Sequence, residues 1–121
     1  MLPRRHRLTR PEEFRTVLRG GPGVRSRRAG GRAVVVHRAD RNPSSDESPG
    51  PPRVGLLVSK AVGNSVVRHR VSRRLRALMA TRLDSLPQGT DVVLRATPAA
   101  ASVDHPGLAD DLDRALARAS R

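Results

Sequence analysis

The chain has 121 residues and carries 24 basic against 11 acidic side chains, which is a formal net charge of +13 at pH 7. This length is typical of a single domain, here 1–121, and allows a modest core, while the charge favours a polyanionic partner. The absence of cysteine excludes disulfides and thiolate metal sites, and no apolar run is long enough to span a membrane, so we expect a cytoplasmic protein.

The first part of the chain predicts a basic arm followed by a helix. Residues 1–8 form the arm, which is either a frayed terminus or a contact for phosphate groups. Its arginines are Arg4, Arg5 and Arg7. Thr9 and Glu12 fit a capping box, and Pro11 is tolerated in the first turn of the helix that follows. Gly20 begins the glycine-rich stretch that ends this helix.

Three strands and a polar loop are predicted next. We expect a short strand at 24–28 and a β-branched strand at 32–38. Residues 40–52 contain Asn, Pro, Ser, Gly and acidic side chains without an apolar residue, so we interpret them as a flexible hairpin loop within the domain. Residues 53–59 are largely apolar and predict a central strand.

A strongly basic, amphipathic helix is predicted from about Asn64 to Asp84, with Asn64 as its N-cap. The apolar residues Val67, Val71, Leu75 and Leu78 recur at i, i+4, i+8 and i+11 and form one stripe. The opposite arc carries Arg70, Arg73, Arg74 and Arg76, with Arg68 on the flank. The plain interpretation of such an arc is a solvated surface. Because no acidic side chain compensates the repulsion between these arginines, we favour binding to nucleic acid.

The last third of the chain predicts a turn at 86–90, a strand at 91–96, a loop with a helical turn at 97–103, and a helix capped by Asp104. The apolar face of this helix consists of Leu108, Leu112, Ala115, Leu116 and Ala119. The order is therefore α-β-β-β-α-β-α. We predict an α+β fold in which helices pack on one four-stranded mixed sheet.

Residues typical of a protein catalyst are missing. The histidines are His6, His37, His69 and His105, and they show neither metal-ligand spacing nor a partner for nucleophilic catalysis. The carboxylates Asp110, Asp111 and Asp113 lie in the first half of the last helix, where we expect them to complement the helix dipole and to solvate its outer face. We therefore predict neither catalytic nor metal-binding residues.

A resemblance to the bacterial ribonuclease P protein subunit lies in residues 58–76, which read Val-Ser-Lys-Ala-Val-Gly-Asn-Ser-Val-Val-Arg-His-Arg-Val-Ser-Arg-Arg-Leu-Arg. The family signature runs Lys-x-x-Gly-Asn-Ala-Val-x-Arg-Asn-Arg-x-Lys-Arg-x-x-Arg. The opening 2–8, the pair Glu13-Phe14 and residues 52–55 also resemble the family, so the similarity covers nearly the whole chain. His69 replaces the usual Asn and Ser72 the usual Lys, while Leu18 replaces a second aromatic residue.

The resemblance implies specific site residues and one unusual feature of the fold. The residues that it assigns to RNA binding are Lys60, Asn64, Arg68, His69, Arg70, Arg73, Arg74 and Arg76. It places Phe14, and less directly His37, in a cleft for the 5′ leader of precursor tRNA, although spacing alone favours core packing for Phe14. It also implies a left-handed crossover between strands 53–59 and 91–96, against the general rule.

The function implied by the resemblance is that of the protein component of ribonuclease P, an accessory to a catalytic RNA. The holoenzyme removes the 5′ leader of precursor tRNA by metal-dependent hydrolysis, with Mg²⁺ held mainly by the RNA. The protein is expected to bind its RNA one to one, to screen phosphate charge and to supply no general base; no membrane is involved. The alternatives are a small basic structural RNA-binding protein of ribosomal type and a self-sufficient nuclease.

Overall fold

The computed structural model describes residues 2–21, 24–41 and 50–120. The main elements are α1 (Pro11–Arg19), β1 (Arg25–Gly30), β2 (Val34–Asp40), β3 (Arg53–Leu57), α2 (Ser65–Ala80), β4 (Thr90–Ala96) and α3 (His105–Ala119). Short 3-10 helices lie at η1 (Arg4–His6), η2 (Leu83–Ser85) and η3 (Pro98–Ala101). This order confirms the predicted α-β-β-β-α-β-α arrangement and the helical turn within 97–103.

The four strands form one mixed sheet in the order β1-β2-β4-β3. β1 and β2 are antiparallel, as are β2 and β4, whereas β3 and β4 are parallel. β4 therefore lies between β2 and β3, so β3 is an edge strand and the prediction of a central strand was wrong. The connection 40–52 joins two strands that are not neighbours. The prediction of a hairpin loop was wrong for this reason; residues 42–49, where we predicted flexibility, lie outside the described residues. The left-handedness of the β3–α2–β4 crossover stays a prediction.

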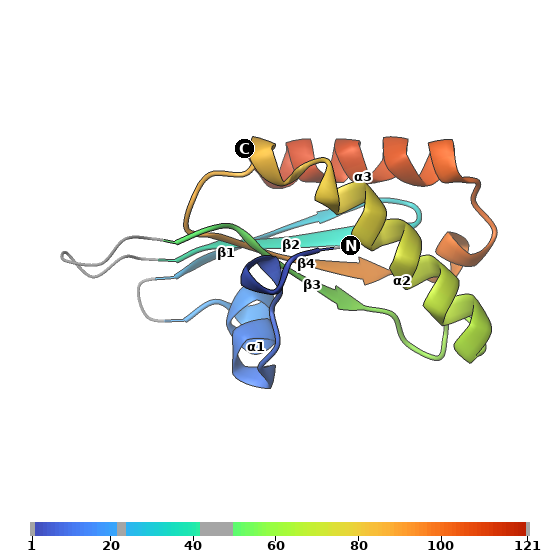
Figure 1. The fold of residues 1–121 in the computed structure, drawn as a ribbon, viewed down its shortest axis with the longest axis horizontal. Helices are drawn as coiled ribbons and strands as arrows, with labels where there is room; N and C mark the ends of the chain where they lie inside the picture. Colours follow the sequence, from blue (N-terminus) through green and yellow to red (C-terminus); the bar gives the residue numbers. More distant parts are fainter. Residues whose placement is uncertain (1, 22–23, 42–49, 121) are drawn as a thin grey trace.

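Helices cover both faces of the sheet, with α1 on one face and α2 and α3 on the other (Figure 1). Because side chains alternate along a strand, each strand contributes to both layers. Val36 and Leu94 belong to the larger core beneath α2 and α3, whereas Ala39 and Val93 belong to a smaller core beneath α1. The smaller core includes Val17 of α1 and is lined at its edge by partly buried apolar side chains.

The start of α1 is capped differently from the prediction. Arg10 is the N-cap and has an extended backbone, as expected of a residue that precedes proline. Glu13, not Glu12, reaches back: its Oε1 accepts the N–H groups of Arg10 at 2.9 Å and Thr9 at 3.1 Å. The predicted capping box was therefore one residue out of register: the first helical residue is Pro11, so the N-cap is Arg10 rather than Thr9.

The turn between β1 and β2 is held by a carboxylate from α3. Asp111 accepts the backbone N–H groups of Arg32 (2.9 Å), Ala33 (2.8 Å) and Val34 (3.0 Å). A Cβ at Gly31 would lie 2.6 Å from Asp111 Oδ2, so this approach needs a glycine. Asp111 thus joins α3 to the sheet, contrary to the solvating role that we predicted, and β2 begins at Val34 rather than at residue 32.

The helix α2 ends at Ala80, four residues before the predicted Asp84. The carbonyl of Leu78 accepts hydrogen bonds from the Thr81 hydroxyl at 3.0 Å and from Arg82 Nη1 at 2.8 Å, which satisfies a carbonyl of the last turn. Arg82 also pairs with Asp113 of α3, and this hydrogen bond lowers the pKa of the Asp113 carboxyl. Asp113 therefore joins α3 to the turn that follows α2, a contact that was not predicted from the sequence.

Candidate nucleic-acid interface

The start of α2 is built by local contacts. The side-chain oxygen of Asn64 accepts the backbone N–H of Val67 at 3.0 Å, so Asn64 is the N-cap, as predicted. The predicted apolar stripe also faces the core: Val71, Leu75 and Leu78 are buried and Val67 is partly buried. Asn64, predicted to bind RNA, thus has a structural role in addition to any RNA contact that it makes.

Most of the predicted RNA-binding side chains lie on the exposed part of α2 and the loop before it. The exposed residues are Lys60, Asn64, His69, Arg70, Arg73 and Arg76, whereas Arg68 and Arg74 are half-buried. The exposed apolar residue Val66 lies on the same surface, with 73% of its area accessible. A helix that buries one stripe and presents cations on the rest is suited to lie along an RNA backbone, where Arg side chains contact phosphate oxygens.

Two of these arginines are held by main-chain carbonyls. Arg70 Nη2 donates to the carbonyl of Ala101 at 3.4 Å, and Arg74 Nη1 donates to the carbonyl of Val103 at 3.2 Å. Arg68 lies on the opposite flank, where its Nε is buried without a hydrogen-bond partner among the described residues. The cations of α2 are therefore divided between two sides of the helix.

Phe14, predicted for the leader cleft, packs from α1 onto the sheet. It borders the smaller core together with Leu18 and Leu57, and its ring lies against Gly55 of β3. The interpretations of Phe14 as a core residue and as part of a cleft are compatible here, because the side chain is only partly buried.

His37 lies on the same face of the sheet as α1, on the strand β2. It is only 7% exposed, and its Nε2 has no hydrogen-bond partner among the described residues. Burial, and then the positive charges of Arg95 and Arg28, lower the pKa of His37. Arg28 of β1 is the direct cross-strand neighbour of His37. His37 was predicted from the sequence, but Arg28 and Arg95 were not, because only the strand register brings these cations to the same face of the sheet.

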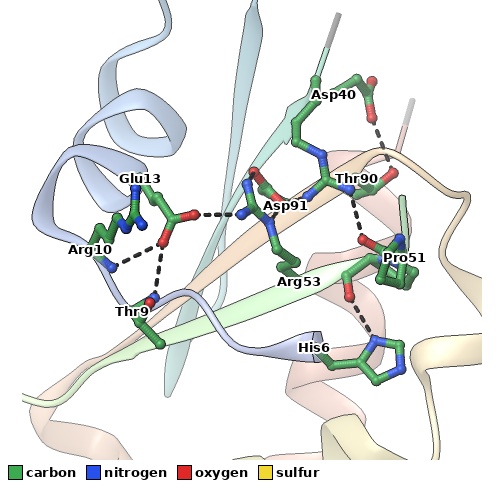
Figure 2. Close-up of polar contacts among 11 residues, drawn as sticks. His6, Thr9, Arg10, Glu13, Asp40, Pro51, Arg53, Thr90 and Asp91 are labelled. Atoms are coloured by element: carbon green, nitrogen blue, oxygen red, sulfur yellow. Dashed lines mark hydrogen bonds and ion pairs between the residues drawn. The ribbon is translucent and has the colours of Figure 1, made fainter. Parts of the chain in front are cut away.

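Residues 2–8 of the arm are folded onto the sheet rather than frayed. Leu2 and Leu8 are buried, and the N–H of Leu8 donates to the carbonyl of Val54 at 2.9 Å. His6 Nδ1 lies 2.8 Å from the carbonyl of Pro52 and donates to it (Figure 2). Arg7 Nε donates to the carbonyl of Leu2 at 2.7 Å. The side chains of Arg4, Arg5 and Arg7 are exposed on this ordered arm.

A charge network that was not predicted connects α1, β3 and β4 (Figure 2). Arg53 makes a bidentate pair with the buried Asp91, with both N–O distances at 2.9 Å, and it also contacts Glu13. Arg41 donates to Asp91 Oδ1 at 2.5 Å and to the carbonyl of Pro51 at 2.7 Å. The network holds α1 and the two ends of the connection 40–52 against the sheet.

The network also shifts the pKa values of its members. The hydrogen bonds and charge of Asp91 raise the pKa of Arg53. Burial lowers the pKa of Arg41, although Asp91 opposes this. For Glu13, burial alone would raise the pKa, but the N–H groups of Arg10 and Thr9 and the Arg53 guanidinium outweigh it, so its pKa is lowered. The network therefore favours the charged forms of Glu13 and Arg53.

In residues 2–21, 24–41 and 50–120, no three His, Asp or Glu side chains lie together so that they would hold a metal ion. Within the same ranges, none of the helices combines the length and the apolar character that crossing a membrane requires.

The ribonuclease P family model matches residues 2–120. The chain belongs to the ribonuclease P protein family. It is 50% identical over 121 residues to the ribonuclease P protein component of Streptomyces griseus, covering 98% of this chain and 94% of that one. It is 49% identical over 120 residues to that of Rhodococcus opacus, covering 98% and 91%.

Solved structures of ribonuclease P proteins share the fold of this family member. The Staphylococcus aureus protein has a TM-score of 0.76 at 21% identity, covering 94% of each chain. The Thermotoga maritima protein has a TM-score of 0.74 at 19% identity, covering 94% of this chain and 97% of that one. These likenesses confirm the predicted fold class, whereas the roles of individual side chains stay predictions.

Proposed function

We propose that this protein is the protein component of a ribonuclease P and assists a catalytic RNA in removing the 5′ leader of precursor tRNA. The observation that carries the proposal is the construction of α2. The helix buries an apolar stripe and leaves Arg70, Arg73 and Arg76 of the signature exposed. In this role the helix contacts the RNA subunit through phosphate groups, and the protein and the RNA associate one to one in the cytoplasm.

The face of the sheet that carries α1 is the proposed contact for the leader. Phe14 supplies an aromatic edge, and the orphaned Nε2 of His37 lies between the cations Arg28 and Arg95. An unpaired nucleotide strand offers both a base that packs on an apolar side chain and phosphates that accept hydrogen bonds from arginine. The charge network of Glu13, Arg53 and Asp91 keeps α1 in place beside this surface.

The chemical step in this proposal belongs to the RNA. The Mg²⁺ ions of the reaction are held mainly by the RNA subunit, where they supply the activated water and stabilise the leaving oxygen. The contribution of the protein is to neutralise phosphate repulsion between the two RNAs, which increases the affinity for substrate and for metal. Arg70, Arg73 and Arg76 are suited to this because the planar guanidinium group matches the oxygens of a phosphate.

The test is reconstitution with the catalytic RNA of the same organism. At low Mg²⁺ concentration, addition of the full-length protein should increase cleavage of precursor tRNA, and protein alone should cleave nothing. If the protein binds RNA but never stimulates cleavage, a structural RNA-binding role of ribosomal type is supported instead. Cleavage by the protein without RNA would support a self-sufficient nuclease.

A further inference from the structure

A basic hollow lies between α2 and the start of α3, and we call it the α2–α3 hollow. Its volume is about 400 Å³, and it is lined by Arg70, Arg73, Arg74, Ala77 and His105. The four residues from α2 stand at i, i+3, i+4 and i+7, so they share one side of that helix. His105 is the first residue of α3 and lies far from the signature in the sequence.

The guanidinium groups in the hollow are partly oriented before any ligand arrives. Arg70 and Arg74 each donate to one carbonyl of the segment that leads into α3, at 3.4 Å and 3.2 Å. A guanidinium group has five N–H donors, so each of these arginines keeps donors for a ligand. Because the carbonyls restrict these side chains, binding costs less conformational entropy than it would with free arginines.

Among the described residues, those that line the hollow include no carboxylate to balance its charge. The nearest acid in the sequence is Asp104, which is absent from the lining and whose Oδ1 accepts the N–H of Gly107 at 2.8 Å as the cap of α3. Three clustered arginines repel one another, and an anion between them relieves this repulsion. The planar fork of arginine matches the oxygens of a phosphate group.

We propose that the α2–α3 hollow binds one phosphate group of the partner RNA and that His105 is a ligand of this phosphate together with Arg70, Arg73 and Arg74. This inference rests on the proposed function, since it takes RNA as the partner. It extends the interface beyond the signature helix to α3, and it makes the segment around Ala101 and Val103 a positioning element for two RNA-binding arginines.

A double-mutant cycle on RNA affinity tests the shared phosphate. The dissociation constant of the full-length protein and the catalytic RNA is measured for the wild type, Arg73→Ala, His105→Ala and the double variant. Each single change should weaken binding about tenfold, as expected for a hydrogen bond to a charged group. The double variant should lose less than the product of the single losses, because both side chains bind the same phosphate.

The matched control is a second cycle in which Arg114 takes the place of His105. Arg114 is an exposed arginine on α3, and its Nε donates to the carbonyl of Asp110 in the same helix at 3.4 Å. Arg114→Ala should change the affinity for the RNA by no more than about twofold, and its effect should multiply with that of Arg73→Ala in the double variant, as expected of independent sites. The variant His105→Arg should bind at least as tightly as the wild type, and thermal unfolding should show that all variants fold.

Two results would overturn the hollow while leaving the proposed function intact. In the first, the wild type stimulates cleavage, but His105→Ala leaves the affinity for the RNA unchanged, or the losses of affinity from Arg73→Ala and His105→Ala simply multiply in the double variant. The second is displacement of the RNA by polyglutamate as readily as by polyphosphate, which would assign the site to carboxylates. Failure of the wild type to bind the RNA or to stimulate cleavage would reject both proposals.

Discussion

The ring of Phe14 occupies the space that a side chain at Gly55 would need: a Cβ on Gly55 would lie 2.5 Å from Phe14 Cζ. This contact joins α1 to the edge strand β3 and positions the only aromatic side chain of the protein beside the proposed leader surface. The absence of a side chain at Gly55 thus allows α1 to approach the sheet this closely.

The variant Gly55→Ala should displace Phe14 and weaken both the fold and the leader contact. Overpacking of this kind costs about 1–3 kcal/mol, which urea unfolding would measure. The affinity for precursor tRNA with a leader should decrease more than that for mature tRNA. Gly30→Ala is the control, because a Cβ there meets nothing within 4 Å; its stability should stay within about 0.5 kcal/mol of the wild type. Equal effects of both changes would contradict the importance of the Phe14 contact.

The two roles of Asn64 can be separated by a pair of substitutions. Asn64→Ala removes the cap of α2 and should destabilise the protein by about 1 kcal/mol. Asn64→Asp keeps an oxygen that accepts the Val67 N–H, so stability should be preserved. The added negative charge should nevertheless weaken binding to the RNA subunit. Thermal unfolding and filter binding measure the two effects, and unchanged RNA affinity for Asn64→Asp would place Asn64 outside the interface.

Asp111 should be far more important for stability than its neighbour Asp110. Asp111→Ala leaves the N–H groups of Arg32, Ala33 and Val34 without their carboxylate, and hydrogen bonds to a charged group contribute about 1.5–3 kcal/mol. We expect a loss of about 2–3 kcal/mol in the free energy of unfolding. Asp110 is exposed, and Asp110→Ala should change stability by less than about 0.5 kcal/mol. Similar losses for both would show that the β1–β2 turn does not depend on this carboxylate.

The pKa of His37 should be low in the free protein and should rise when the leader binds. Burial lowers its pKa below the ordinary 6.5, so the unfolded chain binds more protons in that range and stability falls as the pH decreases below about 6.5. An anionic strand beside His37 should raise its pKa. NMR titration of the His37 ring protons with and without a leader oligonucleotide measures both values. The leader contact is contradicted if the pKa of His37 is the same in both titrations.

Features that depend on neighbouring residues were largely predictable from the sequence. The stripe from Val67 to Leu78 and the cap at Asn64 arise from helical periodicity and from a side chain that bonds three residues ahead, so both were predicted. The order of strands and helices was also predicted. Errors occurred at the ends of elements. Glu13 rather than Glu12 accepts the backbone N–H groups at the start of α1. The helix α2 ends at Ala80, earlier than predicted, and the carbonyl of Leu78 accepts side-chain hydrogen bonds there.

The sequence by itself determined the family, the order of the elements and the cation-rich face of α2, because these depend on spacing along one chain. Only the tertiary structure decided which distant residues meet. The insertion of β4 between β2 and β3, the placement of Arg28 and Arg95 beside His37, and the approach of His105 to Arg73 all follow from strand register and helix packing. Contacts of this kind join residues tens of positions apart, and no local propensity specifies them.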